Sequence, residues 1–136
     1  MTKEERLAAL QRELDEMRGE LAGTREAAVR ARRFVLVDEN DKTCAMLDVT
    51  KDGPALVLAD ENGKTRTVLV MGKEGPALIL CDENGKHRAS LRMGRNGPRL
   101  LLRDENGKDR VVMTIDKDGP RVNLRDEQGK DIWKAP

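Results

Sequence analysis

Residues 75–96 read GPALILCDENGKHRASLRMGRN, and the two marks of this stretch return along the chain every 22 residues. The first mark is Asp-Glu-Asn or Asp-Glu-Gln, which begins at Asp38, Asp60, Asp82, Asp104 and Asp126. The second mark is Gly-Pro, which begins at Gly53, Gly75, Gly97 and Gly119. A fixed period of this length indicates that one supersecondary unit is copied several times along the chain.

Each 22-residue unit divides into two halves of eleven residues, which align on a column of apolar side chains: Leu36, Leu47, Leu58, Leu69, Leu80, Leu91, Leu102, Met113 and Leu124. If each half is a strand, residues two positions earlier share this face, and they form a second column: Phe34, Ala45, Leu56, Thr67, Leu78, Ala89, Leu100, Val111 and Val122. The opposite face mixes Val and Ile with many arginines. We therefore predict strands with one apolar face and one largely solvated face.

Two kinds of turn separate the strands. Asn-Gly tolerates positive φ, so the Glu-Asn-Gly-Lys segments predict type I′ hairpin loops. Proline cannot donate to a ladder, so the Gly-Pro segments mark the other ends of the strands. A turn at Asn84-Gly85 sets Leu80 opposite Ala89 and Leu78 opposite Leu91, all on the apolar face.

A turn at Glu74-Gly75 sets Leu69 opposite Leu80. Loops of three residues would place apolar residues against arginines, so we expect loops of two or four residues. The prediction is an antiparallel meander of about nine short strands between residues 34 and 134.

The first thirty-three residues predict a coiled-coil stalk. Thr2 and Glu5 form a Thr-x-x-Glu capping box, which starts a helix. Apolar and small residues then follow a heptad, with Leu7, Leu14, Leu21 and Ala28 at position a and Leu10, Met17, Thr24 and Ala31 at position d. Glu13 precedes Arg18, and Glu20 precedes Arg25, at the g-to-e spacing of interchain salt bridges in a parallel assembly.

A helix packed on its own β domain is the alternative. Leucine at both a and d leaves dimer, trimer and tetramer open. The predicted domains are a stalk at residues 3–33 and a β-hairpin-repeat domain at residues 34–136.

A single sheet with one apolar face must bury that face against something. The predicted fold is mainly β with an N-terminal α coiled coil, and three copies assemble as a trimeric β-prism whose leucine columns meet on a common axis. The alternative is a monomeric up-and-down β-barrel. Phe34 and Trp133, nine times eleven residues apart and almost the only aromatic residues, are expected to plug the two ends of the core.

Catalysis, cofactors and metals are not predicted. His87 is the only histidine, and Ser90 is the only serine, which excludes the usual nucleophilic triads. The Asp-Glu-Asn-Gly segments lack the bidentate Glu of a calcium loop, and turn chemistry explains their composition without metal. The two cysteines, Cys44 and Cys81, form no disulfide framework; with no signal peptide in the sequence, they favour the cytoplasm.

The net charge is only +1, but its distribution along the chain is uneven. Residues 34–85 carry 5 basic and 10 acidic side chains (−5), and residues 86–136 carry 13 and 8 (+5). The second segment holds a candidate stripe for an anionic polymer such as a glycan, lipopolysaccharide or nucleic acid: Arg88, Arg99, Arg103, Arg110, Arg121 and Arg125. Solvated arginines that discourage edge-to-edge aggregation are the alternative. Contact between the acidic segment of one copy and the basic segment of another is a further option.

A leucine heptad that leads into repeats such as residues 78–86, LILCDENGK, resembles the stalk and β-prism or β-helix segments of trimeric fibrous proteins, including phage tail spikes and surface fibres. It also resembles uncharacterised bacterial proteins that join a coiled coil to short β-hairpin repeats. The resemblance covers the architecture of the whole chain and brings no family active site. It implies homotrimerisation and a structural role, with a binding module for an anionic polymer as the alternative function.

Overall fold

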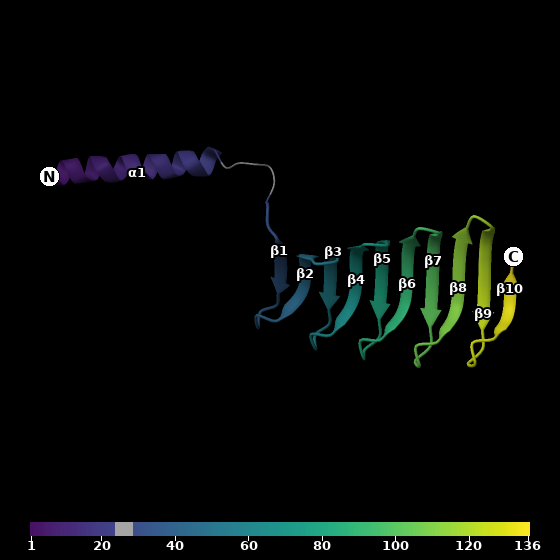
Figure 1. Cartoon of the computed structure of the whole chain (residues 1–136). Coiled ribbons are helices and arrows are strands. Elements are labelled where there is room, and N and C mark those ends of the chain that lie inside the picture. The colour runs from purple at the N-terminus through teal and green to yellow at the C-terminus, as the bar shows by residue number, and fades with distance from the viewer. Residues whose placement is uncertain (24–28) are drawn as a thin grey trace. The chain divides into compact units, whose positions relative to one another are not determined.

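The computed structural model describes residues 1–23 and 29–136, with side chains described for residues 1–20 and 29–136 (Figure 1). The chain divides into two compact units, Met1–Ala31 and Arg32–Pro136, and each is described by itself. Of the predicted heptad, Thr24 and Ala28 lie outside the described residues, as does the side chain of Leu21.

The described residues of the first unit form one helix, α1 (Lys3–Gly23). The predicted capping box is confirmed at its start. The backbone N–H of Thr2 donates to Oε2 of Glu5 at 2.6 Å, and the N–H of Glu5 donates to Oγ1 of Thr2 at 3.2 Å. These two bonds satisfy groups that a helix N-terminus otherwise leaves unpaired. The coiled coil itself stays a prediction.

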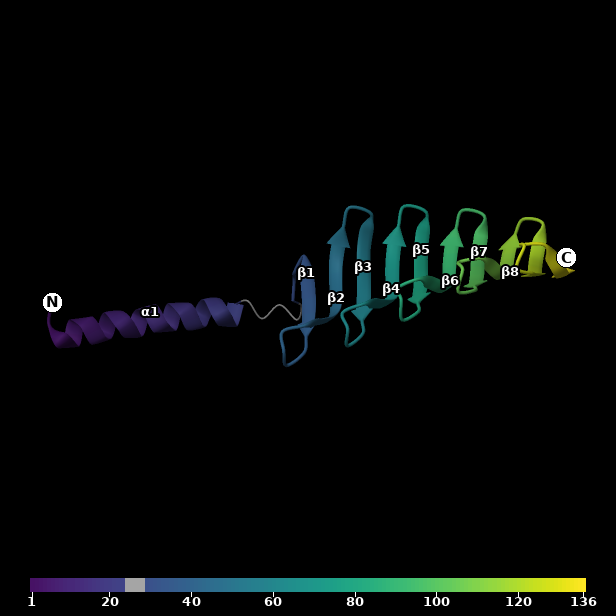
Figure 2. The same ribbon diagram turned by 90° about the horizontal axis from the view of Figure 1, so that it is seen from below.

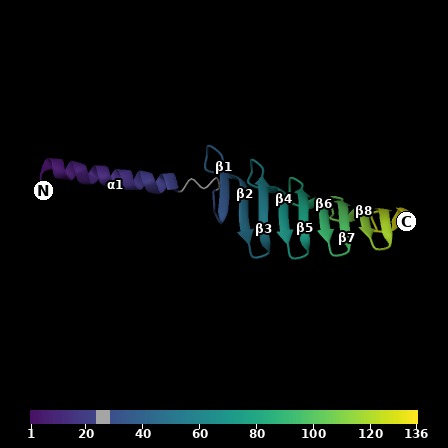
Figure 3. The same ribbon diagram turned by 90° about the horizontal axis from the view of Figure 1, so that it is seen from above.

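The second unit is one antiparallel sheet of ten strands, each paired with the next in chain order. The strands are β1 (Arg33–Val37), β2 (Thr43–Thr50), β3 (Gly53–Ala59), β4 (Thr65–Gly72), β5 (Gly75–Cys81), β6 (His87–Gly94), β7 (Gly97–Arg103), β8 (Asp109–Asp116), β9 (Gly119–Arg125) and β10 (Asp131–Ala135). The views from below and from above show the same succession of hairpins (Figure 2, Figure 3).

The predicted meander is confirmed, with ten strands rather than about nine. The alternative of a closed up-and-down barrel is wrong for this chain, because β1 and β10 do not pair and form the two edges of an open sheet.

The turns that begin at Asp38, Asp60, Asp82, Asp104 and Asp126 define what we call the Asp-turn edge of the sheet. Leu78 lies opposite Leu91 and Leu80 opposite Ala89, as predicted. The type I′ loop, however, is wrong. Gly85 has φ of 78° and its N–H donates to the carbonyl of Asp82 at 2.9 Å, but Asn84 is not left-handed.

The loop at this edge spans five residues, 82–86, an odd number that the sequence argument had excluded. A register shift between Leu80 and Cys81 adds one residue to the β6 side. This β-bulge restores the even count that keeps leucines facing leucines. The bulge is the physical reason for the difference, and it recurs in the other four hairpins of this edge.

At the other edge, which we call the Gly-Pro edge, each turn is a two-residue loop. Gly72 pairs with Gly75 around Lys73 and Glu74, so Leu69 lies opposite Leu78 and not opposite Leu80 as predicted. The error is two residues, and the side chains therefore stay on the predicted face.

The face opposite the leucines, which we call the arginine face, is better buried than predicted. It carries every buried side chain of the sheet: Ala55, Ala77, Ile79, Cys81, Ser90, Leu101 and Val112. Arg88 and Arg103 lie beside Ser90 and Leu101, with which they line a narrow gap. Long arginine stems cover apolar neighbours while their charged ends stay in water. The middle of this face is therefore partly buried within one chain, whereas Arg92, Arg99 and Arg121 stay exposed.

Two glycines of the Gly-Pro edge form a matched pair for a stability test. Gly75 has φ of 121°, and an added Cβ would lie 2.1 Å from the carbonyl oxygen of Met93. Gly119 has φ of 108°, but its added Cβ meets nothing within 4 Å. We expect Gly119→Ala to lower the free energy of unfolding by about 1–2 kcal/mol through backbone strain alone.

Gly75→Ala should cost roughly 1–3 kcal/mol more, because the backbone of β6 must also move. Urea unfolding followed by circular dichroism measures both variants, and equal losses would contradict the close approach of Gly75 to β6.

Candidate self-association surface

The leucines of the sheet form an uninterrupted ladder, because every strand places an apolar side chain directly opposite the next. This central row runs across all ten strands as Phe34, Leu47, Leu56, Leu69, Leu78, Leu91, Leu100, Met113, Val122 and Ala135. Six consecutive rungs, from β2 to β7, are leucine. Direct cross-strand pairs of this kind are the units that stabilise a sheet.

Two further apolar rows flank the central row and complete what we call the apolar face. The row nearer the Asp-turn edge alternates large and small side chains: Leu36, Ala45, Leu58, Thr67, Leu80, Ala89, Leu102, Val111, Leu124 and Trp133. The row at the Gly-Pro edge pairs Val49, Met71, Met93 and Ile115 with the four prolines. The predicted eleven-residue column is thus divided between two rows, because the chain reverses at every strand.

No residue of this apolar face is buried, although the structure describes all of them. Among its large exposed side chains, the exposed fraction runs from 36% at Leu78 to 66% at Val49. Burying the exposed half of one leucine stabilises by on the order of 1 kcal/mol. A continuous apolar patch across ten strands far exceeds what single soluble chains usually expose, and such patches mark interaction sites.

Phe34 and Trp133 lie at the two ends of the apolar face, on β1 and β10. They do not share a row, as the eleven-residue count had suggested, because Phe34 lies opposite Leu47 in the central row and Trp133 opposite Leu124 in the flanking row. Both rings are about half exposed in the single chain. Their role as plugs of an oligomer core stays a prediction.

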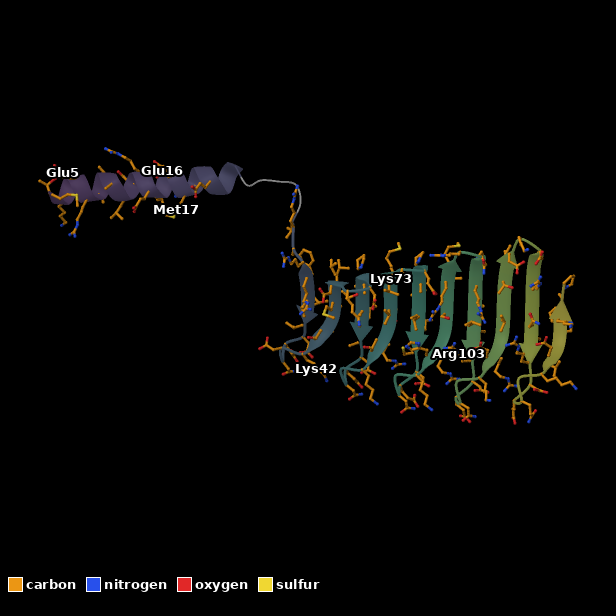
Figure 4. The ribbon with its side chains drawn as sticks, in the orientation of Figure 1. Glu5, Glu16, Met17, Lys42, Lys73 and Arg103 are labelled. Carbon is orange, nitrogen blue, oxygen red and sulfur yellow. The ribbon has the colours of Figure 1, made fainter. Side chains whose placement is uncertain are left out.

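The first unit carries a second exposed apolar set. Leu7, Leu10, Leu14 and Met17 follow the heptad along α1, and their exposed fractions lie between 44% and 62%. Figure 4 labels Met17 and its neighbour in sequence, Glu16, on opposite sides of this helix. The described residues of the first unit do not cover this stripe, and an apolar stripe on a helix is a surface that packs against other apolar groups.

The arginines proposed to bind an anionic polymer are all paired with carboxylates of the same chain. Arg103 Nε donates to Asp109 Oδ1 at 2.7 Å, and Arg99 lies 3.7 Å from the same carboxylate (Figure 4 shows Arg103). The remaining pairs are Arg88–Asp82, Arg110–Asp104, Arg121–Asp116, Arg121–Asp118 and Arg125–Asp131, at 3.1–3.4 Å. A polyanion would have to displace these carboxylates, which weakens the case for this stripe as its binding site.

Two of these arginines, Arg88 and Arg110, also connect neighbouring hairpins, as does Arg66 outside the stripe. Sequence reasoning did not foresee these contacts. Nε of Arg66, Arg88 and Arg110 donates to the carbonyl of Cys81, Arg103 and Arg125, respectively, at 2.7–3.2 Å. Lysines connect successive turns in the same way, with Lys64 donating to Glu83 and Lys86 to Glu105 at 3.1 Å, and Lys42 to Glu61. The signal was present as basic residues that recur every 22 positions.

The first residue of each Asp turn organises that turn with its side chain. Oδ1 of Asp60 accepts hydrogen bonds from the backbone N–H of Asn62 at 2.9 Å and of Lys64 at 3.0 Å. Asp104 makes the equivalent bonds, and Arg66 or Arg110 contacts the second oxygen of each carboxylate. The bond from the Lys64 backbone, followed by those from Asn62 and Arg66, lowers the pKa of Asp60 despite its partial desolvation. The pKa of Asp104 is lowered by the same kind of contacts, with the bond from Lys108 foremost.

The Asp turns therefore predict an acid-sensitive fold. A carboxyl whose pKa falls on folding stabilises the folded state above its ordinary pKa of 3.8, and this stabilisation disappears as pH drops through the lowered value. We expect the urea midpoint to stay constant from neutral pH to about pH 5 and to fall below pH 4. In Asp60→Asn, Asp104→Asn the midpoint at neutral pH should be lower and the acid-dependent fall smaller.

Glu61→Gln, Glu105→Gln is the matched control, since it removes two neighbouring charges that organise no turn. An equal flattening of the acid dependence in both double variants would contradict this role of the Asp turns.

Among the described residues, neither a metal site nor a membrane-spanning helix adds a further candidate site. Among the residues that the structure describes, no group of three or more His, Cys, Asp or Glu side chains could hold a metal ion. In that same part of the chain, no helix has the length and apolar character to cross a membrane. No known family model matches the chain, and no curated protein is significantly similar to it.

Proposed function

We propose that this protein is a structural, self-assembling stalk or fibre segment without a catalytic role, and that its assembled form is a homotrimer. The observation that carries the proposal is the apolar face, in which an unbroken row of apolar side chains crosses the sheet and no residue is buried. In the trimer, three such faces meet on one axis as a triangular β-prism. Leu and Met side chains of three copies then exclude water along the whole sheet.

The composition of the two faces supports association through the apolar face and not through the arginine face. On the arginine face, Ile79, Leu101 and Val112 are already buried within one chain, and arginines such as Arg88 and Arg103 are paired with carboxylates. On the apolar face, the leucines have no neighbours beyond their own row and its flanks. A sheet that has partly buried one face by itself still gains free energy by burying the other.

The uniformity of the apolar face favours another copy of the same chain as its cover. Its rows repeat with the period of the sequence, so an identical sheet presents the same spacing of large and small side chains. Large side chains such as Leu58 and Leu80 alternate with Thr67 and Ala89, and this relief suits interdigitation between like surfaces. The predicted parallel coiled coil of α1 would hold the copies together.

Leu91 and Arg92 provide a matched test, because they are adjacent exposed residues of β6 that point to opposite faces. We expect Leu91→Glu to reduce the assembly from about three times the chain mass of 15.2 kDa to a single chain, since it places carboxylates on the shared axis. Arg92→Glu introduces the same side chain on the arginine face and should leave the assembled mass unchanged. Light scattering after size-exclusion chromatography measures both.

A monomeric native chain would refute the proposal, as would a trimer that survives Leu91→Glu but not Arg92→Glu. A stable dimer that depends on Leu91 would keep self-association through the apolar face and refute the trimeric prism.

The stalk is tested through the apolar stripe of α1. A helix of this length gains little stability alone, so we expect the helical ellipticity at 222 nm to rise with protein concentration. Leu14→Asp should abolish that rise because Leu14 occupies an a position of the heptad. Glu16→Asp introduces the same residue on the outer side of the helix and should preserve the rise; equal effects of the two substitutions would contradict the coiled coil.

A further inference from the structure

The two edge strands of the sheet are unusually apolar for edges. Among the described residues, β1 pairs only with β2 and β10 only with β9. Phe34, Val35, Leu36 and Val37 of β1 and Ile132 and Trp133 of β10 are all exposed. Edge strands of soluble proteins usually carry charges or are covered, because their free N–H and C=O groups invite another strand. Repeat proteins likewise end in polar capping units, whereas only Arg33, Asp131 and Lys134 are charged in these two five-residue strands.

The 22-residue period makes the two edges complementary in register. Trp133 stands one period after Val111, and Leu36 stands four periods before Leu124. Inside the sheet, Val111 lies opposite Leu124 and Val112 opposite Asn123. The same rule places Trp133 of one copy opposite Leu36 of another, and Lys134 opposite Val35.

We propose that β10 of one copy pairs antiparallel with β1 of a second copy in this register, so that the sheet continues from chain to chain. The pairing joins edges and does not depend on the apolar face or on the trimer proposed above. The central row of the apolar face and the row nearer the Asp-turn edge both continue through the joint without interruption. The central row would read Val122, Ala135, Phe34, Leu47 and the flanking row Leu124, Trp133, Leu36, Ala45.

Charge supports a second copy in this head-to-tail orientation. The segment that ends in β10, residues 86–136, carries 13 basic and 8 acidic side chains, whereas residues 34–85, which begin with β1, carry 5 and 10. The joint therefore brings a balance of +5 against one of −5. Opposite charges steer the two ends together and disfavour joints between two β1 ends or two β10 ends.

A disulfide between positions 35 and 134 tests the joint. Directly opposite residues of an antiparallel pair have Cα atoms roughly 4.5–5.5 Å apart, within disulfide range. In one chain β1 and β10 are separated by nine strand spacings, about 43 Å, and they lie at opposite ends of the sheet (Figure 1). The bond can therefore form only between copies.

The experiment uses the full chain with Cys44→Ala and Cys81→Ala, so that only introduced thiols remain. Val35→Cys, Lys134→Cys should give, on mild oxidation, a reducible series of linked chains or closed rings, with the peptides around positions 35 and 134 joined. Leu36→Cys, Lys134→Cys is the control, because it exposes two thiols of which one points to the other face. We expect at least a fivefold lower yield of linked chains from it.

Equal yields from the two variants, or bonds that mainly join position 35 to 35 and 134 to 134, would overturn the joint. Adding Leu91→Glu separates the two proposals. Linkage that persists in that background supports the joint by itself, whereas a trimer without linkage leaves the apolar-face assembly intact and refutes the joint.

Discussion

The whole sheet depends on the constraint that every turn must return the chain to the same face. Side chains alternate along a strand, so a connection that adds one residue would exchange the leucines for the arginines. The Gly-Pro edge meets the constraint with two-residue loops such as Lys73-Glu74. The Asp-turn edge meets it with five-residue loops, each corrected by a bulge. The apolar face is continuous only because the two-residue loops recur at every turn of one edge and the bulged five-residue loops at every turn of the other.

The residue pairing inside a hairpin could be predicted from the sequence, whereas the loop lengths and β-bulges that produce this pairing could not. The pairing of Leu78 with Leu91 follows from the spacing of the apolar residues. A turn that shifted this pairing by one residue would place charged side chains opposite leucines. The bulge beside Cys81 leaves no mark in that periodicity. The predicted register across the Gly-Pro edge was wrong by two residues. A shift of two residues keeps every side chain on the same face, so the apolar pattern alone does not distinguish the two registers.

Which face is covered within one chain could not be predicted either. Counting side chains by polarity made the arginine face appear solvated, but an arginine has a long alkyl stem and a donor end that reaches the next hairpin, as Arg88 does at the carbonyl of Arg103. Its polarity in a sequence therefore conceals its role in packing. The terminal hairpins lack this contact. Cys44 and Ile132 stand where the inner hairpins have arginine, and Asp41, with φ of 60°, stands where they have glycine.

Within residues 33–135, all of which the structure describes, each strand contacts only the strands next to it in sequence. The sheet is therefore a linear array of hairpins at a constant spacing. Removing or duplicating one 22-residue unit changes the extent of the sheet by two strand spacings, roughly 9.6 Å, and leaves all other contacts as they were. Length is then a property that gene duplication adjusts in equal steps, without any redesign of the core, and relatives of different length would share one interface chemistry.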